Sequence, residues 1–334
     1  MIDNTRLSVL ELCAGAGGQA LGLERAGFDH SGAVEIDADA CSTLELNRRA
    51  WAVLNEDLRS FSGRRFRGVD LVAAGVPCPP FSVAGKQLGR LDDRDLFPAA
   101  LRVVSEVHPR AVMLENVRGF ATARFDAYRR ELMSAIEGLG FRCTWRLLYS
   151  SHFGVPQLRP RFVLIALRHE FIPYFTWDFE PAQPKSVGEC LVDLMAEDGW
   201  CGAMKWAERA ARIAPTIVGG SKKHGGPDLG PTRARREWQL LGINGLGIAD
   251  GPPKATDPED FVPKLTLRMV ARLQGFPDDW KFAGKKTSAY RQVGNAFPPP
   301  VAEGVGALLR NALQKATDVN PTQLSLQSPL TEAV

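Results

Sequence analysis

The chain has 334 residues, of which 45% are hydrophobic and 24% are charged, and its formal net charge is +3. These values are typical of a globular protein and exclude a disordered or fibrous one. No apolar run approaches the roughly 18 residues of a membrane span, and the N-terminus lacks the basic and apolar regions of a signal peptide. The six cysteines are scattered without metal-ligand spacing, so we expect a reduced, cytoplasmic protein with no membrane association and no metal site.

The first 170 residues alternate between strand and helix patterns. Apolar strands are predicted at residues 7–12, 32–36, 51–54, 69–73, 111–114, 141–149 and 161–167. Helices are predicted between them, first from the glycine-rich turn up to Gly27, and then at residues 39–49, 94–107 and 125–138. Short apolar strands that alternate with helices predict an α/β fold with a doubly wound, mostly parallel sheet.

The pattern weakens after about residue 179, where glycine, proline and basic residues become frequent. We interpret residues 181–264 as a smaller, loop-rich domain. Helices return at 265–273 and at 300–315, and the last one is expected to pack against the first domain. The expected division is therefore 1–180, 181–264 and 265–316, with a frayed tail at 317–334. No coiled-coil pattern requires a dimer, so we expect a monomer.

A glycine-rich turn follows the first predicted strand. Gly15, Gly17 and Gly18 would let a ligand approach the backbone closely, although a plain tight turn has the same composition. A dinucleotide fingerprint would need a further glycine at Leu21, and its absence disfavours a Rossmann oxidoreductase. The turn therefore indicates a nucleotide-like cofactor of another kind.

Three acids follow the second and third predicted strands. Glu35 and Asp37 lie about 20 residues beyond the glycines, where a carboxylate can accept hydrogen bonds from ribose hydroxyls. Asp57 follows the third strand and is placed to contact an adenine amino group. All three could instead be ordinary loop acids. A cofactor with ribose and adenine but without a pyrophosphate motif points to S-adenosylmethionine.

Cys78 lies between Pro77 and Pro79, directly after the fourth predicted strand. The prolines stiffen the loop, and sites in doubly wound folds gather at the carboxyl ends of strands. These features favour a nucleophilic thiol, whereas most cysteines are small buried side chains that serve packing.

Three further charged residues lie at strand ends. Glu115 ends an apolar strand, where burial without a purpose is costly, so it is a candidate acid beside the thiol. Arg159 and Arg161 project to the same side if the chain is extended, and they would suit anionic or carbonyl groups of a substrate. The alternatives are an exposed strand-end acid and a surface basic pair.

In their order and residue types, these motifs resemble those of the DNA cytosine-5 methyltransferases. The matching segments are the glycine turn, Pro77-Cys78, Glu115-Asn116-Val117, Gln157-Leu158-Arg159-Pro160-Arg161 and Gly294-Asn295. The resemblance covers residues 7–180 and 265–312, and the stretch between them takes the place of the family's target-recognition domain. It implies methyl transfer from S-adenosylmethionine to carbon 5 of a flipped-out cytosine in duplex DNA, which leaves S-adenosylhomocysteine. A restriction–modification role is also implied, with a cognate endonuclease as a further partner.

The resemblance implies a role for each motif. Cys78 adds to carbon 6 of cytosine, Glu115 binds the ring N3 and amine, and Arg159 and Arg161 position the base. Ser82 matches a residue near the flipped nucleotide. Cofactor contacts are implied for Cys13, Gly15, Gly17, Gly18, Glu35, Ile36, Asp57, Leu58 and Asn295.

Two positions depart from the family pattern. The family usually has an aromatic residue at the position of Cys13, where it stacks on adenine, and often a glutamine at the position of Pro79. We expect the first change to alter cofactor affinity and the second to leave the nucleophile intact. How Cys78 is activated stays open, with Arg161 or proton transfer on substrate arrival as the two candidates.

The stretch from Lys205 to Trp238 is basic, with eight Lys or Arg residues against three acids. Such a stretch is either a solvated basic face or a phosphate-contacting surface. Given the resemblance, we expect DNA contacts from Lys222, Lys223, His224, Arg233, Arg235 and Arg236.

Two alternative functions are compatible with some of the same motifs. An RNA cytosine-5 methyltransferase similar to the tRNA-acting branch would share the fold, but the large glycine-rich recognition segment favours DNA. A catalytically silent DNA-binding module is disfavoured because Cys78, Glu115 and both arginines occur together.

Overall fold

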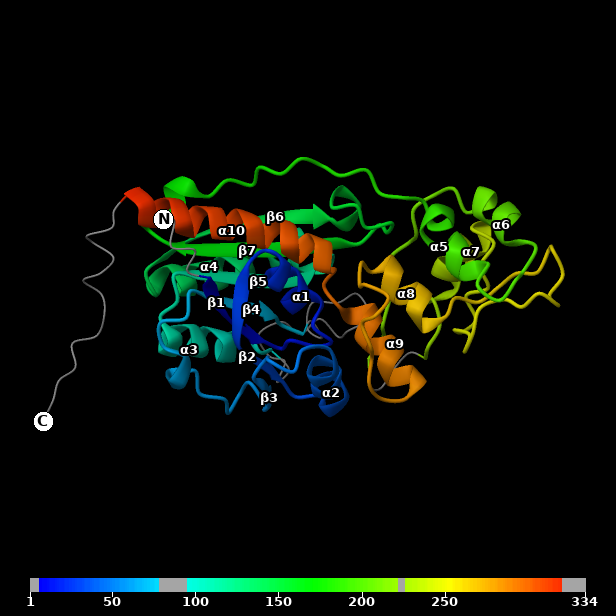
Figure 1. The fold of residues 1–334 in the computed structure, drawn as a ribbon. Coiled ribbons are helices and arrows are strands. Elements are labelled where there is room, and N and C mark those ends of the chain that lie inside the picture. The colour runs from blue at the N-terminus through cyan, green and yellow to red at the C-terminus, as the bar shows by residue number, and fades with distance from the viewer. Residues whose placement is uncertain (1–5, 78–94, 222–225, 320–334) are drawn as a thin grey trace, which may run out of the picture.

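The computed structural model describes residues 6–77, 95–221 and 226–319 (Figure 1). Its centre is a seven-stranded sheet in the order β3-β2-β1-β4-β5-β7-β6. The strands are β1 (Leu7–Leu12), β2 (Phe28–Glu35), β3 (Val53–Asn55), β4 (Leu71–Gly75), β5 (Ala111–Val117), β6 (Phe141–Tyr149) and β7 (Pro160–Arg168). Within this sheet β7 runs antiparallel to both of its neighbours, and the other pairs are parallel. The predicted doubly wound, mostly parallel sheet is confirmed.

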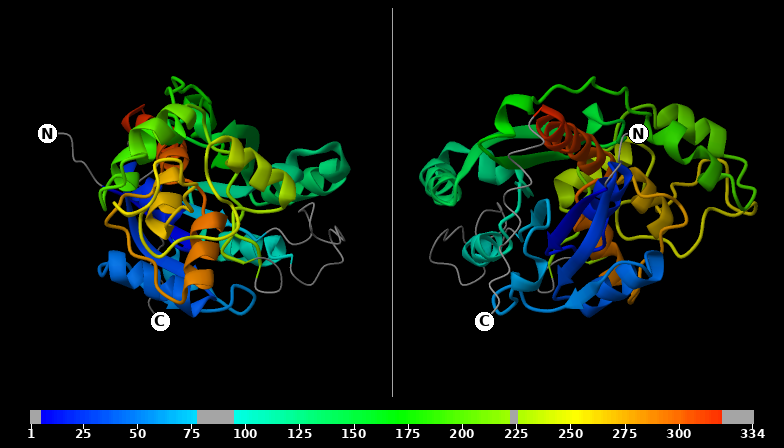
Figure 2. Two further views of the ribbon diagram at one scale, coloured as in Figure 1. Left: turned by 90° about the vertical axis from the view of Figure 1, so that its right-hand side faces the viewer. Right: turned by 60° about the vertical axis from the view of Figure 1, so that its left-hand side comes forward.

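Helices cover both faces of the sheet because its central strands are apolar on both sides. Leu10 and Leu12 of β1 pack with α3 (Phe97–Val107) and α4 (Asp126–Gly138), while Val9 packs with α1 and α10 on the opposite face (Figures 1 and 2). These last two helices are α1 (Gly18–Arg25) and α10 (Pro299–Val319), and α2 (Ala38–Asn47) follows β2. The chain therefore returns at its C-terminal end to cover the first strands.

Residues 181–264 contain three short helices that were not predicted, but these cover only 25 of the 84 residues, so the region is loop-rich as expected. They are α5 (Val187–Met195), α6 (Ala203–Arg209) and α7 (Thr232–Leu240). A capping box between Ser186 and Glu189 begins α5, and this signal is readable in the sequence. Helices α8 (Leu267–Leu273) and α9 (Lys286–Asn295) follow this region, and α9 was not predicted.

Short 3-10 turns link several of these elements. They are Arg64–Phe66, Arg118–Ala121, Ala123–Phe125, Ser150–His152 and Ile172–Tyr174. None of the helices in the described ranges has the length and apolar character needed to cross a membrane.

Helices α5, α6 and α7 lie at the end of the molecule away from α3, beyond α8 and α9 (Figure 1). Their buried tryptophans, Trp206 and Trp238, belong to one continuous apolar cluster that also contains Leu21 of α1 and Leu44 of α2. The region and the sheet therefore share packing, and the domain boundaries at 181 and 264 stay predictions.

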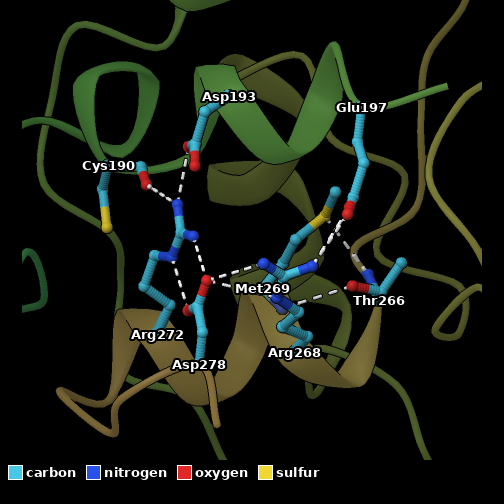
Figure 3. A network of polar contacts seen from close by, with 8 residues as sticks. All are labelled: Cys190, Asp193, Glu197, Thr266, Arg268, Met269, Arg272 and Asp278. Carbon is cyan, nitrogen blue, oxygen red and sulfur yellow. Dashed lines mark hydrogen bonds and ion pairs between the residues drawn. The ribbon is translucent and has the colours of Figure 1, made fainter.

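An ion-pair network ties α5 to α8 (Figure 3). The Arg272 guanidinium donates to the Asp193 carboxylate (2.6 Å) and to Asp278. Arg268 donates to Glu197 (3.0 Å) and to the same Asp278 (2.8 Å). Hydrogen bonds from the two guanidinium groups lower the pKa of Asp278 to about 2, and the one from Arg272 has the larger effect. The network holds α5 against α8.

Candidate active site

The carboxyl ends of β1, β4 and β5 meet at one edge of the sheet, which is where ligands bind in doubly wound folds. Gly75 ends β4 at this edge. A Cβ atom placed on Gly75 would lie 3.5 Å from the Cys13 carbonyl oxygen and 3.7 Å from Glu115 Oε2. The glycine turn and the candidate acid are therefore near neighbours, although they are about a hundred residues apart in the sequence.

The Glu35 carboxylate shapes the glycine turn. Its Oε2 accepts a hydrogen bond from the Gly15 N–H (2.8 Å), and its Oε1 accepts from the N–H groups of Ile36 (2.9 Å) and Asp37 (2.8 Å). The Glu35 residue is buried at the end of β2. The structure thus places Glu35 directly against the turn, while the Asp37 side chain caps α2 through the Asp39 N–H (3.0 Å).

The three glycines of the turn have different surroundings. A Cβ on Gly15 would meet no atom of the described residues within 4 Å, although its φ of +54° is left-handed. A Cβ on Gly17 would lie 2.9 Å from the Trp280 ring, and one on Gly18 would lie 2.2 Å from the Phe297 carbonyl oxygen. Gly17 and Gly18 are therefore required by packing within the protein, and Gly15 is the glycine that faces open space.

Trp280 is a residue of this site that the sequence did not single out. Its indole Nε1 donates to the carbonyl oxygen of Ala16 in the turn (3.2 Å), and the ring is buried. An aromatic residue far along the chain carries no local signal for this contact, because the pairing depends on the return of the chain after α8.

The other predicted cofactor residues lie around the same edge. Cys13 adopts a left-handed φ of +55°, and burial raises the pKa of its thiol, so it is a poor nucleophile. Asp57 accepts from the Arg59 guanidinium (2.6 Å), which lowers the pKa of its carboxyl. Ile36 is 61% exposed, and Leu58 is buried.

Glu115 and Arg161 form a nearly buried ion pair. The Arg161 Nε lies 2.9 Å from Glu115 Oε1, and the two side chains are 9% and 12% exposed. They come from neighbouring strands, since β5 and β7 pair antiparallel with Val117 opposite Arg161. Burial raises the pKa of the Glu115 carboxyl, and the positive charge of Arg161 opposes that rise. The pair can therefore bind a polar heterocycle and hold or release a proton there.

Arg159 has different partners from Arg161. Its Nη1 donates to the Ile217 carbonyl (2.7 Å), and its Nη2 donates to the carbonyls of Gly294 (2.7 Å) and Ala296 (2.9 Å). The residue is 1% exposed, and burial lowers its pKa. The structure therefore brings Arg161 to Glu115 and directs the terminal nitrogens of Arg159 to three backbone carbonyls.

Asn116 holds the start of the segment that leads to Cys78. Its Nδ2 donates to the Val76 carbonyl (3.3 Å), and Val76 is the second residue before that cysteine. Cys78, Ser82, Lys222, Lys223 and His224 themselves lie outside the described residues.

The predicted DNA contacts that are described lie on α7. Arg233 and Arg236 are exposed, and Arg235 is half-buried, with its Nη2 donating to the Thr232 hydroxyl (3.4 Å). Arg235 borders a hollow of about 300 Å³ whose other lining residues are Val218, Gly220, Gly226, Asp228, Gly230 and Pro231. Asn295, predicted to face the cofactor, donates from Nδ2 to the Gly220 carbonyl (3.2 Å) near this hollow.

A family model for the C-5 cytosine-specific DNA methylases matches residues 7–310. The chain belongs to this family. The methylase is 56% identical over 311 residues to the Type II methyltransferase M.NaeI of Lentzea aerocolonigenes, covering 92% of this chain and 75% of that one. It is 52% identical over 311 residues to the Type II methyltransferase M.NgoMIV of Neisseria gonorrhoeae, covering 92% and 98%.

Solved structures share the fold of the methylase at low identity. The DNMT2 of Spodoptera frugiperda matches with a TM-score of 0.63 at 18% identity, covering 91% of this chain and 99% of that one. The methyltransferase EhMeth of Entamoeba histolytica matches with a TM-score of 0.65 at 14% identity, covering 92% and 99%. The resemblance inferred from the motifs is thus confirmed, and the family match argues against an oxidoreductase.

Proposed function

We propose that this methylase transfers a methyl group from S-adenosylmethionine to carbon 5 of a flipped-out cytosine in a specific sequence of duplex DNA. The observation that carries the proposal is the buried pair of Glu115 and Arg161 beside the open glycine turn. The type II names of the relatives support a modification role in a restriction–modification system, with a cognate endonuclease acting on the same site. We further propose that it acts as a monomer in the cytoplasm.

The residues at the sheet edge fit the proposed cofactor. Gly15 leaves open space at the turn, and the Glu35 carboxylate at 2.8 Å from its N–H can accept further from a ribose hydroxyl. Ile36 offers an exposed apolar face, and Asp57 and Leu58, which follow β3, would contact the adenine. When bound, S-adenosylmethionine supplies an electrophilic methyl group on its sulfonium.

Carbon 5 of cytosine is too weak a nucleophile to take a methyl group unaided. In the proposed mechanism the Cys78 thiolate adds to carbon 6, and the electron pair moves through the ring so that carbon 5 attacks the methyl group. Loss of the carbon 5 proton to a base, such as water, then allows elimination of the thiolate and restores the aromatic ring. Asn116 supports this assignment because it holds Val76, and thus the approach to Cys78, next to Glu115.

Glu115 acts at N3 of the cytosine. Negative charge builds on this nitrogen as the thiolate adds, and a carboxyl group with a raised pKa can donate a proton to it. Arg161 keeps the carboxyl oriented through its 2.9 Å contact and places a positive charge at the same point.

Residues 181–264 would recognise the target. Arg233, Arg235 and Arg236 on α7, with Lys222 and Lys223, supply positive charge for phosphate and guanine contacts. Their arrangement in one short basic stretch favours a polyanionic partner.

The proposal is tested by expressing the chain in cells that lack cytosine methylation and sequencing their DNA after bisulfite treatment. We expect 5-methylcytosine within one short sequence, and no product with the Cys78→Ser variant, which should still bind the cofactor. Purified protein is then offered duplex DNA and tRNA in parallel. Methylation of tRNA alone, or normal turnover by Cys78→Ser, would overturn the proposal.

A further inference from the structure

A buried polar junction lies where the middle of the recognition region, residues 181–264, meets the catalytic sheet. Segment 214–217 runs beside segment 156–159, with the Leu158 N–H donating to the Ala214 carbonyl (2.8 Å) and the Ala214 N–H to the Pro156 carbonyl (2.9 Å). The Thr216 hydroxyl also donates to the Leu158 carbonyl. Segment 214–217 of the recognition region is therefore paired with the chain that enters β7.

Two glutamine amides cross this junction in series. Gln157 Oε1 accepts from the Ile217 N–H (2.8 Å), and Gln157 Nε2 donates to Gln274 Oε1 (2.5 Å). Gln274 Nε2 donates in turn to the Val293 carbonyl of α9 (2.8 Å). Both glutamines are 0% exposed. Because Arg159 binds the Ile217 carbonyl, both backbone polar groups of Ile217 are held by side chains.

The chain beyond Ile217 then lies directly on α9. A Cβ on Gly294 would sit 2.4 Å from Gly219 Cα, and a Cβ on Gly219 would sit 2.7 Å from the Arg291 carbonyl oxygen. Such spacing means that the two backbones touch with no side chain between them. Residues 217–220 are thus held against α9, within the basic stretch and shortly before Lys222 and Lys223 in the sequence.

The other end of the junction leads to the cytosine site. Gln157 precedes Arg161 by four positions, and Arg161 contacts Glu115 at 2.9 Å. A shift of residues 214–220 would therefore be passed through the paired segment 156–159 to the residues proposed to bind the base.

We propose that Gln157 and Gln274 are positioning residues that hold the recognition region in register with the cytosine site. This inference rests on the proposed function, and it assigns the two amides to target recognition rather than to methyl transfer. When every polar atom of a buried amide is hydrogen-bonded, the amide favours one arrangement of the elements that it joins, because a shifted arrangement would leave polar groups unpaired. The junction therefore sets which bases lie under the recognition region when the cytosine is in place.

Gln274→Met is the informative variant, because the groups that it frees keep other partners. The Val293 carbonyl still accepts from the Ala296 N–H (3.2 Å), and Gln157 Nε2 still donates to the Leu273 carbonyl (3.1 Å). The side-chain volume is nearly conserved, so the fold should persist. Gln314→Met on α10, half-buried and remote from the junction, is the matched control.

Steady-state kinetics are measured on a short duplex carrying the mapped target and on one with a single changed base pair. For Gln274→Met we expect the KM for the target duplex to rise about threefold to tenfold, and discrimination against the changed duplex to fall by a similar factor. The kcat at saturating DNA and the Kd for S-adenosylhomocysteine should stay at the wild-type and control values. A lower kcat with unchanged KM for DNA and unchanged discrimination would show that the junction only supports the fold, and would overturn the inference.

A second variant keeps the inference testable if Gln274→Met fails to fold. Gly219→Ala pushes the chain at residue 219 off α9 while both glutamine side chains are kept, and we expect the same rise in KM for DNA and the same loss of discrimination. Wild-type values for Gly219→Ala would overturn the inference. Failure of the wild-type chain to methylate DNA would instead overturn the proposed function, so the two outcomes are distinct.

Discussion

The contrast between Gly15 and Gly18 gives the sharpest test of the cofactor turn. An Ala at Gly18 would place Cβ 2.2 Å from the Phe297 carbonyl oxygen, which is backbone and cannot rotate away. Forcing a methyl group into such a packed site costs about 1–3 kcal/mol of the free energy of unfolding. An Ala at Gly15 meets no atom within 4 Å in the part of the chain that the structure describes, but its left-handed φ of +54° costs about 1–2 kcal/mol.

The two variants should therefore lose similar stability and differ in cofactor binding. The methyl group of Gly15→Ala occupies the space proposed for the cofactor, so its Kd for S-adenosylhomocysteine should rise about 10-fold to 100-fold. Gly18→Ala mainly disturbs the packing of α1. In the molecules that stay folded, the affinity for S-adenosylhomocysteine should fall less than in Gly15→Ala. Gly138→Ala, at the end of α4 with no described atom within 4 Å and no left-handed φ, is the control; it should leave the affinity unchanged and raise the free energy of unfolding by up to about 1 kcal/mol, because alanine is the better helix former.

Isothermal titration with S-adenosylhomocysteine and urea unfolding measure both quantities on the same preparations. Wild-type affinity in Gly15→Ala would refute the assignment of that residue to the cofactor. Wild-type stability in Gly18→Ala would refute the packing argument. A selective loss of affinity in Gly18→Ala would show that the turn uses this glycine for binding after all.

Two further predictions concern titratable groups. Glu115→Gln keeps the size of the side chain but cannot supply a proton, so kcat should fall about 10²-fold to 10⁴-fold while the Kd for S-adenosylhomocysteine is unchanged. Because the folded-state pKa of Glu115 is raised, the folded protein holds this proton to higher pH than the unfolded chain does. The contribution of Glu115 to stability therefore declines as pH rises from the ordinary carboxyl pKa through the raised value. Urea unfolding at several pH values should show that Glu115→Gln removes this decline, and an unchanged pH profile would contradict the prediction. Asp278→Asn should lower the free energy of unfolding by about 1 kcal/mol at pH 7, after allowance for the 31% exposure of the Asp278 side chain. The pKa of Asp278 is lowered to about 2, so the stabilisation that its carboxylate provides is present above the ordinary aspartate pKa and is lost as pH falls towards 2. Equal stability of the wild type and Asp278→Asn at pH 7 would rule this out.

The sequence predicts those features whose signal is local or whose residues gather at one edge of the sheet. The central strands are predicted because residues buried on both faces must be apolar over several consecutive positions, as in Leu71–Gly75. Chemistry-bearing residues also follow strand ends in chain order, and the doubly wound topology brings those ends together. The capping box at Ser186 shows that α5 was within reach of the same reasoning.

Only the tertiary structure decides which partners residues of the same type contact. Arg159 and Arg161 are equivalent in the sequence, yet one reaches three carbonyls that lie 58, 135 and 137 residues away and the other reaches Glu115. Gly15 and Gly18 belong to one turn, but the neighbour that makes Gly18 obligatory is the Phe297 carbonyl, supplied by the far end of the chain. No local pattern encodes such partners, because buried polar and packing contacts are set by segments that meet only after the chain has folded.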